Sequence, residues 1–72
     1  MRAYNLFRHR DKQHVICAVP EDRAAPGFIA EKTWEFVRTL AEPAAAPIGF
    51  NPRAATEGVR FNGFYLFQNF SD

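Results

Sequence analysis

The side chains best suited to metal or thiol chemistry lie near the start of the chain. His9 and His14 are the two histidines of this 72-residue sequence, and Cys17 is its single cysteine. Imidazole and thiolate groups are good zinc ligands, but a site needs three or four of them together. In a strand, His14 and Cys17 point to opposite faces because they are three positions apart. We therefore expect no metal site and no cofactor.

Catalysis by Cys17 or by acidic side chains is not expected either. Cys17 lies in a strongly apolar stretch, where burial raises the pKa of a thiol and suppresses its reactivity. A Cys–His nucleophile also needs the imidazole within hydrogen-bond reach and a third group that orients it. No two carboxylates have a spacing that suggests a general acid and a general base. The sequence predicts that the protein is not an enzyme.

Composition and charge indicate a single small domain over residues 1–72. Nine basic and eight acidic residues leave a net charge of +1, far from the excess of a dedicated nucleic-acid-binding protein. No apolar run has the length of a membrane span, and no leader pattern precedes a cleavage site. A lone cysteine forms no internal disulfide and fits a reducing compartment. We expect a cytoplasmic protein that does not bind membranes.

Residues 2–9 and 13–19 have the pattern of a β-hairpin around a charged turn at residues 10–12. The second arm is apolar on both faces, which predicts a position inside a sheet. Pro20 ends this arm, and residues 21–27 form a loop.

Residues 29–42 are compatible with two structures. As a helix, their apolar residues form one stripe, but no capping residue precedes it. As a strand over residues 33–41, they are rich in β-branched and aromatic types, and Trp34, Phe36 and Leu40 share one face. We favour the strand and keep a second helix over residues 29–42 as the alternative.

Residues 51–67 form one helix-to-strand unit. Asn51 is suited to cap the first turn, and Pro52 fits the first helical position because its missing donor costs nothing there. The pair Asn62-Gly63 supplies a left-handed stop, and residues 64–67 continue as a strand.

Gly58 lies in the middle of this predicted helix. A mid-helix glycine costs about 1 kcal/mol relative to alanine, which is tolerated where another element approaches closely. We hypothesise that Gly58 faces a large aromatic ring, either Trp34 or Tyr65.

Other contacts of the helix follow from its spacing. Glu57 lies four residues after Arg53 and three before Arg60, which predicts two ion pairs on the outer side. Phe64, just after the stop, is expected to fold back on Val59.

The predicted fold class is α+β: a two-layer domain with an antiparallel sheet of about four strands and one helix packed on one face. The order along the chain is strand–strand–strand–helix–strand. Such a sheet has a second face that the helix does not cover.

Eight Phe, two Tyr and one Trp are more aromatic rings than one small core holds easily. We predict a small non-catalytic interaction module that binds a protein partner or itself, as a homodimer, through an aromatic sheet face. A groove beside the helix, which would accept an extended peptide or a small apolar ligand, is the other contact site that we consider. The predicted contact residues are Tyr4, Phe7, Phe64 and Phe67, with Arg8 and Arg10 at the rim.

The alternative function is binding of single-stranded nucleic acid by these aromatics and the basic N-terminal hairpin. Open sheet faces with rings and cations stack bases at ~1–3 kcal/mol each. The near-neutral charge and the lack of an RNA-recognition signature make this the weaker hypothesis.

Overall fold

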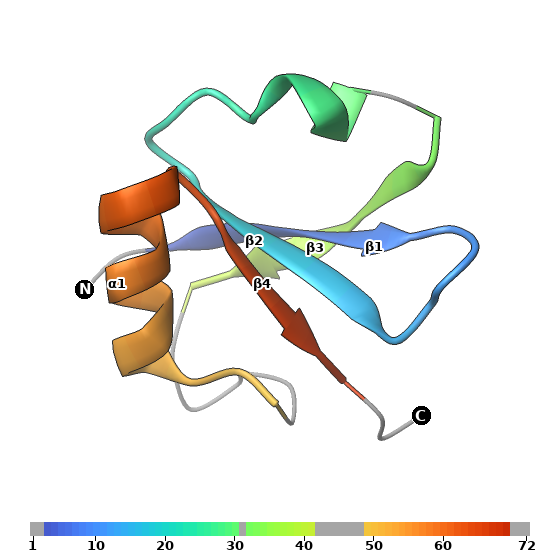
Figure 1. Cartoon of the computed structure of the whole chain (residues 1–72). Coiled ribbons are helices and arrows are strands. Elements are labelled where there is room, and N and C mark those ends of the chain that lie inside the picture. The colour runs from blue at the N-terminus through green and yellow to red at the C-terminus, as the bar shows by residue number, and fades with distance from the viewer. Residues whose placement is uncertain (1–2, 31, 42–48, 70–72) are drawn as a thin grey trace.

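The computed structural model describes residues 3–30, 32–41 and 49–69, which form a four-stranded antiparallel sheet, one α-helix and one short 3-10 helix (Figure 1). This confirms the predicted α+β class and the order of elements. The elements are β1 (Tyr4–His9), β2 (Val15–Pro20), η1 (Gly27–Ala30), β3 (Trp34–Leu40), α1 (Pro52–Asn62) and β4 (Tyr65–Gln68).

The sheet has the order β3-β1-β2-β4, with the predicted hairpin of β1 and β2 at its centre. Its turn is closed by His9, whose Nδ1 accepts hydrogen bonds from the backbone N–H groups of Asp11 and Lys12 at 3.1 and 3.2 Å. Five of the six residues of β2 are buried, which confirms the predicted interior position of the second arm. The sheet therefore ends at β3 on one side and at β4 on the other.

Residues 34–40 are a strand, so the alternative of a second helix over residues 29–42 is wrong. The strand is irregular: Leu6 is opposite Arg38, but the next residue, Phe7, is opposite Phe36, which leaves Val37 as a bulge. The extra residue reverses the faces beyond it. Trp34 packs on one side of the sheet and Leu40 on the other, so the prediction that Trp34, Phe36 and Leu40 share a face was wrong.

The helix α1 begins and ends where the sequence predicts. The Asn51 side chain accepts hydrogen bonds from the N–H groups of Arg53 and Ala54, both at 3.0 Å, and Pro52 is the first helical residue. Gly63 has a left-handed φ of 87°, and its N–H donates to the Val59 carbonyl at 2.9 Å. β4 then starts at Tyr65, one residue later than expected.

Gly58 lies where α1 and β4 approach closely. A Cβ atom at this position would be 3.3 Å from the Cβ of Tyr65 and 3.1 Å from the carbonyl oxygen of Phe64. The hypothesis of a close aromatic neighbour is confirmed, with Tyr65 as the neighbour.

Two smaller expectations about α1 were wrong. Within the described residues, Glu57 forms no ion pair with Arg53 or Arg60, since exposed pairs gain little against the entropy of holding both side chains. Phe64 does not fold back on Val59. It packs on the other side of the sheet, because it precedes Tyr65 and adjacent residues of an extended chain point to opposite faces.

The face of the sheet that α1 covers, here called the helix face, holds the larger core. Phe50 packs against this core, with ring centroids 5.6 Å from Tyr4 and Tyr65 and 5.4 Å from Phe67. Phe50 comes directly before the capping Asn51, the position from which an apolar side chain typically packs on the first turns of a helix. The buried residues are Tyr4, Leu6, Ile16, Ala18, Leu40, Ala55, Val59 and Phe67.

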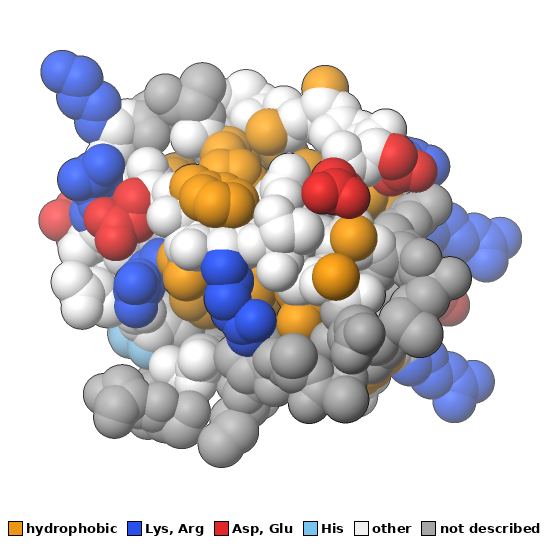
Figure 2. Space-filling view, turned by 180° about the vertical axis from the view of Figure 1, so that it is seen from behind, with side chains coloured by type: hydrophobic (Ala, Val, Ile, Leu, Met, Phe, Trp, Pro, Cys, Tyr) orange, Lys and Arg blue, Asp and Glu red, His pale blue; other side chains and the backbone are white. Residues whose placement is uncertain are grey.

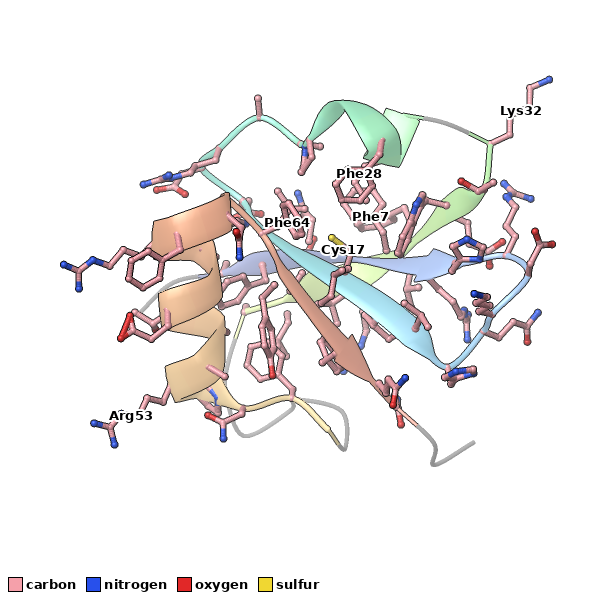
Figure 3. The ribbon with its side chains drawn as sticks, viewed as in Figure 1. Phe7, Cys17, Phe28, Lys32, Arg53 and Phe64 are labelled. Atoms are coloured by element: carbon pink, nitrogen blue, oxygen red, sulfur yellow. The ribbon has the colours of Figure 1, made fainter. Side chains whose placement is uncertain are left out.

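The opposite face, here called the loop face, is not left bare. The segment of residues 21–30, which ends with η1, lies across it (Figures 1 and 3). Phe28 from η1 contacts Phe64 at 5.1 Å and Trp34 at 5.8 Å between ring centroids. Cys17, Val19 and Ile29 are buried beneath these rings. The helix does leave this face uncovered, as expected, but an irregular segment covers part of it.

Candidate interaction surfaces

The four aromatic residues predicted to contact a partner do not form one surface. Tyr4 and Phe67 belong to the helix-face core, each with 6% exposure, whereas Phe7 and Phe64 are half-buried on the loop face. Tyr4 and Phe7 are three positions apart, and so are Phe64 and Phe67. An odd separation along an extended chain sends side chains to opposite faces, so the sequence did hold the signal that separates these pairs.

The two predicted rim arginines meet at one carboxylate. Arg8 Nε lies 3.9 Å from Glu35 Oε2, and Arg10 Nη1 lies 3.8 Å from Glu35 Oε1. The Nε atom of Arg8 is buried and has no hydrogen-bond partner among the described residues. Both distances are long for a charge-assisted hydrogen bond, so Glu35 offsets the two positive charges without fixing them tightly.

The large apolar side chains that do reach solvent are different ones. Phe61 on α1 is 75% exposed, Phe36 on β3 57%, Leu66 on β4 49% and Val37 on β3 37%. Phe36 and Leu66 lie on the loop face, opposite Phe7 and Cys17 respectively. They belong to the two outer strands, beyond the rings that cover the middle of this face. Sequence reasoning missed them because it assigned exposure by residue type and not by position in the sheet.

Phe36 and Val37 are the two exposed apolar residues that are adjacent in the chain. With their neighbours Glu35 and Arg38 they form what we call the β3 edge surface. β3 is the last strand of the sheet, and no described strand pairs with its outer side. In the view from behind, apolar side chains reach the surface beside both basic and acidic ones (Figure 2).

The bulge at Val37 sets the positions of the charges in this surface. Glu35 is opposite Arg8 and Arg38 is opposite Leu6. Arg8 and Leu6 are two residues apart in β1 and share a face, so Glu35 and Arg38 share that face as well. A regular strand would place residues 35 and 38 on opposite sides. The opposite charges therefore lie on the helix face of this edge, whereas the Phe36 ring between them in the chain lies on the loop face.

The side chains considered for metal or thiol chemistry are engaged in the fold. Burial raises the pKa of the Cys17 thiol from 9.0 to about 12, so the thiol is protonated at neutral pH. His9 closes the hairpin turn through Nδ1, and its ring packs on Trp34 at 5.1 Å. Within the described residues, no three side chains of His, Cys, Asp or Glu are grouped to hold a metal ion.

Neither membrane insertion nor similarity to known proteins supplies a further guide. No helix in the described part of the chain is long and apolar enough to cross a membrane. Comparison with protein-family models, with curated proteins and with solved structures finds no match to this chain.

Proposed function

We propose that this protein is a small non-catalytic interaction domain that associates with a second copy of itself through the β3 edge surface. The observation that carries the proposal is the 57% exposure of Phe36 beside Val37, which is 37% exposed, on an outer strand. Exposed apolar groups of this kind are typical of protein contact sites. A partner that covered them would remove apolar area from water at ~25 cal/mol per Å².

The order of residues in the β3 edge surface favours a second copy as the partner. A two-fold axis perpendicular to β3 brings the same patch of both copies together with the chain direction reversed. The sequence Glu35-Phe36-Val37-Arg38 has opposite charges at equal distances from its centre. In the reversed copy, each Glu35 is therefore opposite an Arg38 on the helix face of the edge, and each Phe36 is opposite a Val37.

The expected contact is made by side chains and not by a continuous sheet. The bulge at Val37 interrupts the regular spacing of backbone N–H and C=O groups that strand addition requires. The exposed apolar area is also small beside the ~800 Å² per partner of a standard stable interface. We therefore expect a reversible dimer that dissociates on dilution.

The test compares two exposed phenylalanines by sedimentation equilibrium over a wide range of protein concentration. The wild type is expected to shift from monomer to dimer as concentration rises, and Phe36→Ser is expected to stay monomeric. Phe61→Ser is the matched control, because Phe61 is more exposed but lies on α1, and it should dimerise normally. A monomeric wild type at the highest concentration, or equal loss in both variants, would contradict the proposal.

Single-stranded nucleic acid is the second candidate partner. One observation favours it: the ring centroids of Phe7 and Phe36 are 5.7 Å apart, and basic residues lie nearby. Arg8 follows Phe7 in β1, and Arg10 approaches Glu35, the residue before Phe36. Glu35 opposes this function because it offsets both arginines. Fluorescence anisotropy with a labelled oligonucleotide separates the two functions. Glu35→Gln should strengthen oligonucleotide binding if the arginines bind phosphate, but should weaken a dimer held partly by Glu35 and Arg38.

A further inference from the structure

A cavity of about 470 Å³ lies at the other end of β1 from the hairpin turn, beside α1. Figure 1 shows the start of β1 next to this helix. The lining residues come from three segments: β1, the turn after β2, and α1. They are Tyr4, Arg23, Thr56, Val59 and Arg60. This volume is within the range of small-molecule sites, ~300–1,000 Å³.

The inner wall of the cavity is apolar and fixed. Tyr4 and Val59 are buried members of the helix-face core, with 6% and 2% exposure. Both lie on regular elements, so their positions are set by the sheet and by α1. Little of either side chain is open, so this wall offers a rigid apolar contact for a small part of a ligand.

The outer wall carries two positive charges. Thr56 and Arg60 are four residues apart on α1 and lie on one side of the helix with Val59. Arg23 is placed by a turn in which its N–H donates to the Pro20 carbonyl at 3.1 Å. Two arginines from segments far apart in the sequence therefore line the same space, and the Arg60 guanidinium also lies over the Phe61 ring, 5.7 Å from its centroid.

No carboxylate in the described part of the chain offsets these charges within the cavity. Neither Arg23 nor Arg60 forms an ion pair with a carboxylate of the described residues, and no acidic residue is part of the described lining. The Thr56 hydroxyl donates to the Pro52 carbonyl at 3.1 Å, so the polar donors available to a ligand are the guanidinium groups. Guanidinium groups bind carboxylates and phosphates through paired N–H donors.

We propose that this cavity binds a small organic anion that has one carboxylate or phosphate group on an apolar body. The anionic group lies against Arg23 and Arg60, and the apolar body lies on Tyr4 and Val59. The site is independent of the proposed dimer, because none of its residues belongs to the β3 edge surface.

Three probes separate the two parts of the proposed recognition. Phenyl phosphate has a ring and an anion, inorganic phosphate has the anion alone, and benzyl alcohol has the ring alone. Each is titrated into the isotope-labelled protein, and the backbone amide signals are followed by NMR. Phenyl phosphate should bind most tightly, with the largest shifts at Arg23, Thr56 and Arg60, and added salt should weaken its binding.

Exposed arginine variants test the role of the two charges. Arg23→Gln and Arg60→Gln should each weaken phenyl phosphate binding roughly tenfold, the effect of losing a hydrogen bond to a charged group. Arg53→Gln is the matched control, because Arg53 is on the same helix but points away from the protein (Figure 3). These side chains are exposed, so the variants should fold, and their amide spectra check this.

Several results would overturn the proposal. Absence of shifts at the cavity with every probe would exclude the site. Equal affinity for phenyl phosphate and inorganic phosphate would exclude the apolar subsite, and equal affinity for phenyl phosphate and benzyl alcohol would exclude the role of the charges. An equal loss of binding in Arg53→Gln and Arg60→Gln would show a general effect of charge and not a site.

Discussion

The two faces of the sheet are covered in different ways. The helix face is covered by an eleven-residue helix with a defined cap at each end, and its core holds eight buried side chains of the described residues. The loop face is covered by an irregular segment with a four-residue 3-10 helix, and among the residues described there three side chains are buried. Half-buried aromatic rings complete the second cover. The comparison shows how a short chain without a disulfide closes a second face, and why apolar side chains on the outer strands stay exposed.

Phe67 on the helix face should give the largest loss of stability when truncated. It is 6% exposed and packs on the rings of Phe50 and Tyr65 at 5.4 Å. Phe67→Ala should lower the free energy of unfolding by ~3–5 kcal/mol, the cost of an emptied core site. Urea denaturation measures the difference.

Substitutions at Gly58 and Gly27 test how much space a larger side chain would have at α1 and in the segment that covers the loop face. Gly58→Leu should cost ~1–3 kcal/mol, because the larger side chain has no space between α1 and β4. Gly27 is the first residue of η1, and a Cβ atom there would have no atom of the described residues within 4 Å. Gly27→Ala should therefore change the free energy of unfolding by no more than ~0.5 kcal/mol. Thermal unfolding of both variants checks this. If Gly58→Leu is as stable as the wild type, the close contact with Tyr65 does not exist in solution.

Phe28 is the corresponding ring on the loop face. It is half-buried between Phe64 and Trp34, so Phe28→Ala should cost ~1–2 kcal/mol, below the value for a fully buried aromatic side chain. The same urea experiment applies. A larger loss for Phe28→Ala than for Phe67→Ala would mean that the loop face, and not the helix face, holds the main core.

The local parts of the fold could be predicted from the sequence because local rules decide them. Asn51, Pro52 and Gly63 mark the ends of α1 by requirements that hold in any context. The β-branched and aromatic residues of 34–40 likewise favoured the strand that forms.

The faces of the strands could be predicted only in part. The odd separation of Tyr4 and Phe7 could have assigned them to opposite faces, but the bulge at Val37 has no local sequence signal. The cover of the loop face was also missed, because Phe28 and Ile29 lie in a segment with neither helical nor strand periodicity. The β3 edge surface depends on the bulge at Val37 and on the cover of the loop face, so it could be identified only from the structure.

The pH dependence of the stability contribution of Cys17 measures how well the loop face is closed. Its pKa in the folded protein, about 12, is above the value of 9.0 for an exposed thiol, so the unfolded chain loses this proton first. Stability from the protonated thiol is therefore complete below pH 9 and decreases as the pH rises toward 12. The contribution of Cys17 is the difference between wild type and Cys17→Ala in urea denaturation across this range. A difference that does not change with pH would contradict the burial of the thiol.

The most direct test of self-association detects contacts between two copies. An equal mixture of isotope-labelled and unlabelled protein, at high concentration, is examined by filtered NMR spectroscopy that records only nuclear Overhauser effects between molecules. The proposed dimer predicts such effects between the Phe36 ring of one copy and the Val37 methyl groups of the other, lost in Phe36→Ser. Their absence in the wild type, or effects that involve only Phe61 or Leu66, would contradict the β3 edge surface as the contact site.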